Sequence, residues 1–259
     1  MIWNIFDSHT HYDDSCFNGK REELFAQQKA NGVCGIINAG SSLLSSQSTV
    51  NLAAEYDFIY AAVGVFPLET ENLPEGWLDA IAELAGRPKV VSIGEIGLDY
   101  FLPTNNREKQ KTAFIAQMEL AKDLNLPIQI HDRDADEDVL ELVRKYRPVG
   151  EVHRIFSHPD YARAFTELGL YLAIGPQITY PNSEILVQTV KEMPLDKLLL
   201  ETDCPFLPPA HLAEQPATSD MISFVCEKIA EVRGDVTAQQ VADIALENTS
   251  RLYGLSIIE

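Results

Sequence analysis

Two histidines separated by one residue, His9 and His11, follow the first apolar run of this 259-residue chain. Alternate residues of an extended strand point to the same side, so both imidazoles can reach one metal ion. The chain has only six histidines, and two more of them, His131 and His153, fall within other short β-branched runs. By itself an H-x-H pair can also be structural, so its meaning depends on the ligand types around it.

Two carboxylates occur in the same kind of position. Glu95 follows the run Val90–Gly94, and Asp203 ends the segment Leu200–Asp203. If these strand ends converge, four imidazoles and two carboxylates form a ligand set for two divalent ions bridged by a carboxylate. Such a pair lowers the pKa of bound water and holds the attacking and leaving oxygens of a displacement. The alternative is a separate capping or salt-bridge role for each residue, but ligand types at five strand ends favour a metal centre.

The elements that would position these residues are strands alternating with amphipathic helices. Eight short apolar runs are expected to be strands: Trp3–His9, Cys34–Ala39, Ile59–Gly64, Val90–Glu95, Pro127–His131, Glu151–Ile155, Leu170–Gly175 and Lys197–Asp203. Nine periodic stretches are expected to be helices: Lys20–Asn31, Ser42–Glu55, Glu75–Leu84, Asn106–Leu124, Ala135–Tyr146, Asp160–Leu168, Ser183–Met193, Ser219–Arg233 and Thr237–Tyr253. Such alternation predicts a parallel sheet with right-handed crossovers.

Eight β/α units in about 250 residues predict an α/β fold of the TIM-type (β/α)8 barrel. The alternative is an open doubly wound sheet, which would place a glycine-rich phosphate turn after the first strand. Here that strand ends in Asp7-Ser8-His9-Thr10-His11 instead. Because no Pro-, Gly- or Ser-rich linker divides the chain, we expect residues 1–259 to form a single domain.

Composition limits the partners. With 20 basic and 39 acidic side chains the formal net charge is −19, which argues against broad, sequence-independent binding to a nucleic-acid backbone. Bound cations could still bring phosphates to an acidic protein. The chain has no long apolar run, no basic signal-peptide start and four scattered cysteines. We therefore expect a cytoplasmic protein with free thiols and no membrane association, acting as a monomer.

The motifs together resemble those of the TatD-like metal-dependent deoxyribonucleases, a family within the amidohydrolase-type barrel superfamily. Five segments carry the resemblance, in the expected order: Asp7–Asp13, Gly94–Tyr100, His131–Ala135, Leu200–Asp203 and Glu247–Thr249. The resemblance implies a TIM-type barrel, two divalent metal ions and hydrolysis of phosphodiesters in DNA. Carried over residue by residue, it implies these metal ligands: His9, His11, Glu95, His131, His153 and Asp203.

Two of these ligands, Asp203 and Glu95, are also the expected catalytic residues, and Asp203 would orient or deprotonate the metal-bound water. Arg133, two residues beyond His131, is expected to contact a substrate phosphate. An exposed ion pair with Asp132 or Asp134 is the alternative for Arg133. Imidazole and carboxylate ligands suit Zn, Mn, Fe or Ni, and also Mg where it is abundant, so the sequence leaves the metal open.

The chain departs from the family pattern after the third strand. Relatives carry two histidines where this chain has Phe66 and Leu68, and we expect Phe66 to face the substrate. Neither side chain can hydrogen-bond a phosphate oxygen.

Two further departures affect the site. In the sixth strand, alignment leaves His153, Arg154 or His158 at the ligand position, and His153 is preferred because an arginine cannot be a neutral ligand. The segment 198–227 contains no Lys or Arg, so the loop after the eighth strand is a poor binding surface for a polyanion.

Three functions fit these patterns. The first is a two-metal phosphodiesterase, in particular a DNase, acting on DNA or a small phosphoester. The second is a hydrolase of a different small substrate, such as an amide, a lactone or a phosphoester, on the same site. The third is a metal-binding protein without turnover. The apolar pair Phe66 and Leu68 favours the second function, because fold and metal site do not fix the substrate.

Overall fold

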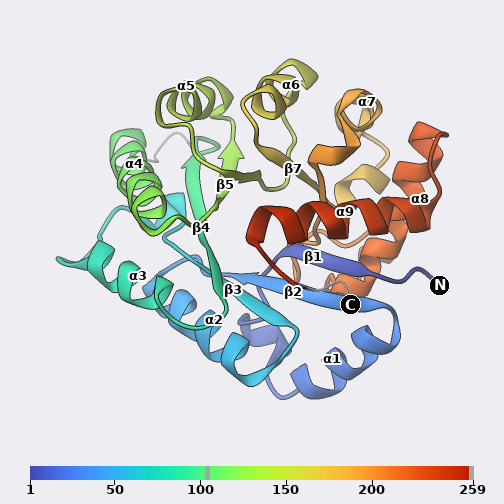
Figure 1. The fold of residues 1–259 in the computed structure, drawn as a ribbon, viewed down its shortest axis with the longest axis horizontal. Helices are drawn as coiled ribbons and strands as arrows, with labels where there is room; N and C mark the ends of the chain where they lie inside the picture. Colours follow the sequence, from blue (N-terminus) through green and yellow to red (C-terminus); the bar gives the residue numbers. More distant parts are fainter. Residues whose placement is uncertain (103–105, 257–259) are drawn as a thin grey trace.

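The computed structural model describes residues 1–102 and 106–256, and its centre is a sheet of eight parallel strands (Figure 1). The strands pair in chain order, from the first to the eighth. Their bounds are β1 Ile5–Thr10, β2 Val33–Ala39, β3 Ile59–Val63, β4 Val90–Asp99, β5 Ile128–Arg133, β6 Gly150–Val152, β7 Tyr171–Ile174 and β8 Leu198–Leu200. The predicted TIM-type barrel is confirmed.

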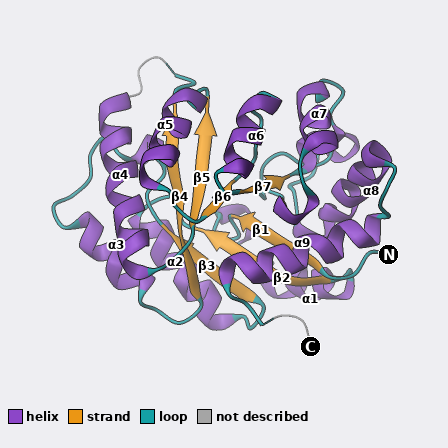
Figure 2. Cartoon of the chain, turned by 45° about the horizontal axis from the view of Figure 1, so that its top comes forward, coloured by secondary structure: helices purple, strands orange, loops and turns teal. Residues whose placement is uncertain are grey.

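Helices surround the strands on the outside (Figure 2). Their bounds are α1 Arg21–Ala30, α2 Leu43–Glu55, α3 Trp77–Ala85, α4 Arg107–Leu124, α5 Asp136–Tyr146, α6 Pro159–Glu167, α7 Glu184–Glu192, α8 Ile222–Arg233 and α9 Ala238–Tyr253. Local signals fix several of their ends. Thr237 and Gln240 form a capping box at the start of α9, and Gly254 ends that helix in the left-handed conformation. No described helix is long and apolar enough to cross a membrane.

The barrel is nearly closed where β1 meets the end of β8. The Asp203 amide donates to the His9 carbonyl at 3.0 Å, and the His11 amide donates to the Cys204 carbonyl at 2.8 Å. Thr10 and Cys204 form a parallel bridge between these hydrogen bonds. The seam therefore joins the chain at the H-x-H pair to the chain at Asp203, two of the predicted ligand positions.

Adjacent residues of the strands pack into two different apolar clusters. Ile36 belongs to a large cluster shared with the surrounding helices, whereas Ile37 belongs to a smaller one with Phe6 and Leu199. Among the described residues, the helix residues in the smaller cluster come from α9, and they include Tyr253. This cluster fills the barrel interior at its amino-terminal end, where α9 crosses β1 (Figure 1).

Several strands end elsewhere than the sequence predicts. β4 continues four residues past Glu95, because Ile96 to Asp99 pair with Ile130 to Arg133 of β5. β6 and β8 end early, at Val152 and Leu200, and the chain then turns at two residues with positive φ, Arg154 at 48° and Asp203 at 59°. Glu95 is thus inside its strand, while His153 and Asp203 lie just beyond theirs.

A glycine allows β4 and β5 to approach closely beside the site. Gly97 has φ of 146° and pairs with His131, and a Cβ atom at Gly97 would lie 2.0 Å from the His131 carbonyl oxygen. Any side chain there would push β4 away from β5 and carry His131 with it.

We expect Gly97→Ala to lower the free energy of unfolding by about 3 kcal/mol or more, since it combines strain with a clash against backbone. Gly169→Ala is the matched control, because Gly169 also has positive φ, at 100°, but nothing lies within 4 Å of its Cβ position. That control should lose only about 1–2 kcal/mol. Urea unfolding curves of both variants provide the measurement, and equal losses would contradict the close approach as a constraint.

Candidate metal centre

The H-x-H pair lies at the mouth of the barrel with both rings turned to the same point. The Nε2 atoms of His9 and His11 are 3.3 Å apart. The opposite ring nitrogens are held by the protein, because His11 Nδ1 is 3.0 Å from the Ala39 carbonyl oxygen and His9 Nδ1 is 3.2 Å from Gln129 Oε1. When Nδ1 carries the proton and donates it to such an oxygen, Nε2 keeps the lone pair with which it can bind a metal ion.

Gln129 fixes the tautomer of His9 through its own hydrogen bonds. Its amide nitrogen donates to the Ser8 carbonyl at 2.7 Å and to the Tyr253 hydroxyl at 3.2 Å. The amide oxygen therefore faces His9 and can only accept, so the His9 proton resides on Nδ1. Gln129 is fully buried, which makes this arrangement rigid.

Glu95 lies between two pairs of histidines and is only 4% exposed. Its Oε1 atom is 2.8 Å from His131 Nδ1 and 3.2 Å from His153 Nε2. Its Oε2 atom is 3.7 Å from Nε2 of both His9 and His11. Each oxygen of this one carboxylate thus faces a different pair of rings, so Glu95 could hold a divalent ion together with either pair.

His131 and His153 are also oriented by carboxylates. His131 Nε2 is 3.2 Å from Asp99 Oδ2, and His153 Nδ1 is 3.0 Å from Glu201 Oε2. Consequently His131 presents Nδ1 to Glu95, whereas His153 presents Nε2. Carboxylate partners of this kind raise the basicity of a histidine and fix its ring plane.

The structure separates the three residues considered for the sixth-strand position. His153 is 2% exposed and stacks on His9, with ring centroids 3.8 Å apart. His158 caps α6 at the surface, where its Nδ1 atom lies 3.4 Å from Asp160 Oδ2. Arg154 turns its guanidinium to Asp203, with Nη1 and Oδ2 3.2 Å apart. Only His153 of the three lies among the other histidines.

Asp203 approaches the histidines from the chain that follows β8, across the junction between β1 and β8. Its Oδ1 atom is 3.3 Å from His11 Nε2 and 3.9 Å from His9 Nε2. All six residues predicted from the sequence are therefore brought together, and nearly all of their surface is buried. The ligand atoms form two groups, and within each group all of them lie within 4.8 Å of one another. One group is His9, Glu95 and His153, and the other is His9, His11 and Asp203.

The charges in this cluster compensate each other. Burial alone would raise the pKa of Glu95, but His153, His131 and His9 hold it well below its usual value. Burial lowers the pKa of His11, yet Asp203 and Glu95 outweigh it and raise the value to about 9. Buried carboxylates and imidazoles that hold one another charged form a donor set that divalent cations can enter by displacing protons.

These residues fit a centre of two divalent ions by the chemistry of their donor atoms. Oε2 of Glu95 faces His9 and His11, which Asp203 also approaches, and Oε1 of Glu95 faces His131 and His153. Because three of the four rings are anchored through Nδ1, and His131 through Nε2, the remaining nitrogens converge without rearrangement.

Sequence reasoning missed the anchoring residues. Gln129 precedes His131 by two positions within β5, so strand alternation places it on the same face one layer deeper. Glu201 also precedes a predicted ligand by two positions, although it lies just beyond the end of β8. That spacing was a usable signal. Arg154 had none, because its approach to Asp203 depends on the positive φ that ends β6.

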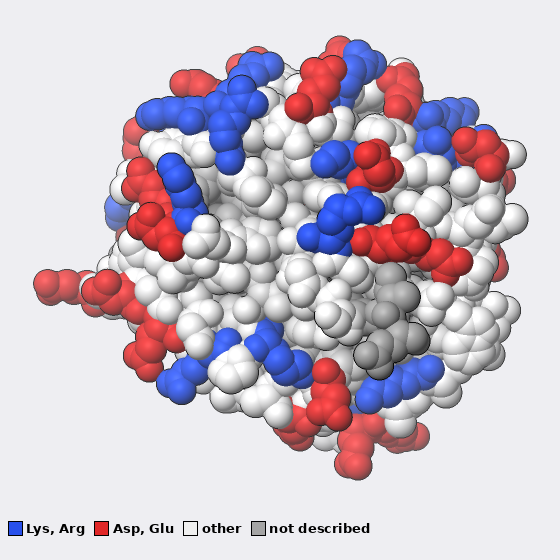
Figure 3. All heavy atoms as spheres, in the orientation of Figure 1, with Lys and Arg blue, Asp and Glu red and all other residues white. Residues whose placement is uncertain are grey.

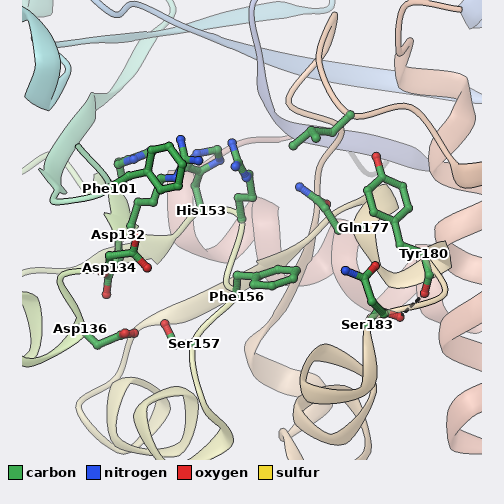
Figure 4. Close-up of a pocket in the computed structure, with 15 residues that line it drawn as sticks. Phe101, Asp132, Asp134, Asp136, His153, Phe156, Ser157, Gln177, Tyr180 and Ser183 are labelled. Carbon is green, nitrogen blue, oxygen red and sulfur yellow. Dashed lines mark hydrogen bonds between the residues drawn. The ribbon is translucent and has the colours of Figure 1, made fainter. Parts of the chain in front are cut away.

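Two cavities open over the cluster. The metal-side cavity, of about 290 Å3, is lined by His11, Glu95, Asp203, Phe66 and Phe206 among others. The side cavity, of about 370 Å3, lies toward the loops that follow β4 to β7 (Figure 4). Both cavities include His131 and Arg154 in their walls.

The two residues expected to meet substrate each line one cavity. Phe66 is in the wall of the metal-side cavity, edge-on to His131 with ring centroids 4.7 Å apart. Arg133 is in the wall of the side cavity, with its guanidinium carbon 3.8 Å from the Phe101 ring centroid. Among the described residues, Arg133 forms no ion pair with Asp132 or Asp134, the alternative that its sequence neighbours suggest.

The face seen in Figure 3 is the amino-terminal end of the barrel, where α9 lies, opposite the cluster. On that face basic and acidic side chains alternate around a mainly uncharged centre. Near the cluster, positive charge comes from single arginines, Arg133 and Arg154, in the cavity walls.

An eight-stranded parallel barrel with four histidines and two carboxylates gathered at its mouth defines a metal-dependent hydrolase of the barrel type. The family model described as TatD related DNase matches residues 6–254. The chain belongs to this family.

Proteins with similar sequences or structures align with this chain over nearly its whole length. The uncharacterized metal-dependent hydrolase YabD of Bacillus subtilis is 36% identical over 97% of this chain and 100% of its own. The 3′-5′ ssDNA/RNA exonuclease TatD of Escherichia coli K12 is 30% identical over the same shares of the two chains. The crystal structure of the TatD homologue YjjV from Escherichia coli superposes with a TM-score of 0.94, at 29% identity, over 98% of this chain and 100% of that one.

The different positions of His153, Arg154 and His158 generate a metal-content prediction. We expect His153→Ala to lose about one of two bound divalent ions per chain, because it removes a ring that faces Glu95. His158→Ala, on the surface of α6, is the matched control and should retain full occupancy. Arg154→Ala should retain metal as well. Elemental analysis after dialysis measures the result, and greater loss from either control would assign the sixth-strand ligand elsewhere.

Proposed function

We propose that this protein hydrolyses phosphodiester bonds of nucleic acid, with two divalent ions held by His9, His11, Glu95, His131, His153 and Asp203. One observation carries the proposal: each oxygen of the buried Glu95 carboxylate faces a different histidine pair. A carboxylate so placed could hold an ion with each pair, and two such ions would suit an in-line displacement at phosphorus. The relative named as a 3′-5′ ssDNA/RNA exonuclease supports the choice of substrate class.

When bound, the two ions would polarise the phosphoester and supply an activated water. The chain's own residues then have separate tasks. Asp203 Oδ2, which Arg154 contacts, is the atom that accepts the proton released by the attacking water. Arg154 has five N–H donors, so those not directed at Asp203 can bind a phosphate oxygen.

Charge favours a small footprint on the substrate. With a net charge of −19 and no Lys or Arg in residues 198–227, the protein cannot neutralise many phosphates at once. Arg133 and Arg154 are the basic residues in the two cavity walls. This distribution suits an exposed, single-stranded end better than a long duplex.

A second candidate function is hydrolysis of a different small substrate, such as an amide, a lactone or a phosphoester. The wall formed by Phe66 favours it, because an aromatic side chain that contacts His131 offers no hydrogen bond to a phosphate.

We expect the protein loaded with Mn²⁺ or Mg²⁺ to shorten single-stranded oligonucleotides and to leave blunt duplexes nearly intact. Removal of metal with a chelator should abolish turnover, and returning the ion should restore it, since the ions would polarise the phosphoester and supply the activated water. Gel analysis of end-labelled strands, together with metal content, measures both. Full metal occupancy without any cleavage would overturn the nuclease assignment in favour of a small-molecule hydrolase or a metal-binding protein without turnover.

We also expect Phe66→His to raise phosphodiesterase activity several-fold, because it places a hydrogen-bond donor in the wall of the metal-side cavity. Leu68→His is the matched control, since Leu68 is 41% exposed and is not in that wall. Initial rates on the same oligonucleotide compare the two variants. If both substitutions act alike, or neither changes the rate, the loop after β3 does not touch substrate.

A further inference from the structure

The side cavity is separate from the metal-side cavity but shares His131 and Arg154 with it. We propose that the side cavity binds the base of the nucleotide whose phosphoester is cleaved. This inference rests on the proposed function, because that function fixes the phosphate at the junction of the two cavities. The volume of about 370 Å3 lies at the small end of the range for ligand sites, as a single ring system requires.

Two aromatic rings are exposed in this cavity. Phe101, in the loop after β4, is 54% exposed, and Phe156, in the loop after β6, is 52% exposed. Both rings line the cavity, and Figure 4 shows Phe101 close to His153 and Phe156 between Asp134 and the residues that follow β7. Exposed aromatic faces beside a phosphate position are the means by which proteins stack nucleobases without reading their sequence.

Arg133 enlarges the stacking surface at Phe101. Its guanidinium carbon lies over the Phe101 ring, 3.8 Å from the centroid, in a cation–π contact that holds the two side chains together. A planar guanidinium offers the same kind of face to a base as an aromatic ring does. The contact therefore orders an exposed side chain that would otherwise be free to rotate.

Gln177, in the turn after β7, provides the polar contact. It is only 5% exposed, and its Nε2 atom is buried without a hydrogen-bond partner among the described residues. Figure 4 shows this amide nitrogen directed toward the His153 side of the cavity. An unpartnered buried donor is destabilising, so it is expected where a ligand supplies the acceptor. A carbonyl oxygen or ring nitrogen of a base is such an acceptor.

Charge decides between a base and a second phosphate. Asp132, Asp134 and Asp136 line the side of the cavity below Phe101 and away from Gln177 (Figure 4). Burial raises the pKa of Asp132 to about 8, so the negative charge here comes chiefly from Asp134 and Asp136. That charge repels a phosphate placed beside it, whereas a neutral ring meets no such penalty. Arg154, at the junction, is the basic group nearest to the metal centre. The side cavity thus suits the base, with the phosphate at the junction.

Calorimetric titration of metal-loaded protein tests the inference without turnover. The probes are thymidine 3′- and 5′-monophosphate and, for comparison, deoxyribose 5-phosphate, which lacks the base. We expect the tighter thymidine monophosphate to bind at least about tenfold more strongly than the sugar phosphate. Phe101→Ala and Phe156→Ala should each reduce this preference by roughly fivefold.

Phe206→Ala is the matched control, because Phe206 is also 52% exposed but lines the metal-side cavity. It should keep the preference for the base. A preference that disappears in Phe206→Ala and survives in Phe156→Ala would overturn the proposal, and so would equal binding of all three probes by the unmodified protein. A preference that persists in a protein unable to cleave oligonucleotides would support the base site while refuting the nuclease function.

Gln177→Leu provides an independent check that does not depend on stacking. Replacing an unpartnered buried amide with an apolar group should leave the melting temperature unchanged or higher. The same variant should lose several-fold in affinity for thymidine monophosphate and none for deoxyribose 5-phosphate. A lower melting temperature with unchanged thymidine binding would show that Gln177 is structural.

Discussion

The structure of the barrel mouth depends on one buried carboxylate, Glu95. An isolated charge with this little exposure would be strongly unfavourable, but His153, His131 and His9 outweigh burial and hold the pKa of Glu95 well below its usual value. The same compensation operates in the opposite direction, since Glu201 and Glu95 outweigh burial and raise the pKa of His153 well above its usual value. Removing any member leaves a neighbour buried without compensation. Each ring is consequently anchored at its outer nitrogen, and the strand ends that carry the anchors must meet.

This requirement explains the layers inside the barrel. At the amino-terminal end the interior is apolar, with Phe6, Ile37 and Leu199 packed under α9. One layer above lie buried polar groups such as Gln129 and Glu151, and burial together with Glu201 raises the pKa of Glu151 well above its usual value. A neutral carboxyl group at Glu151 adds no uncompensated negative charge below the cluster. The charged groups are thus confined to the top layer, where solvent and cations can reach them.

Much of this arrangement follows from the sequence, because a parallel barrel brings strand ends together whatever the details of the strands. The positions of His9, His11 and His131 needed only strand alternation and the count of eight β/α units. What the sequence could not supply was set by contacts between elements distant in the chain. The extension of β4 beyond Glu95 depends on pairing with β5, and the turns at Arg154 and Asp203 depend on how β6 and β8 end. Local propensity does not encode such positive-φ turns.

The acidic chain is compatible with its proposed nucleic-acid substrate, because the charge at the barrel mouth differs from the charge of the whole chain. The carboxylates at the mouth are compensated by imidazoles and would be compensated further by divalent ions, so the local potential is less negative than the total of −19 indicates. Beside the mouth, residues 198–227 contain no Lys or Arg and give a polyanion no extended support. Affinity must then come from a few contacts near the reacting phosphate. Aromatic faces and a buried amide beside the metal centre are contacts of this kind, because they gain free energy from a base without requiring a large positive field.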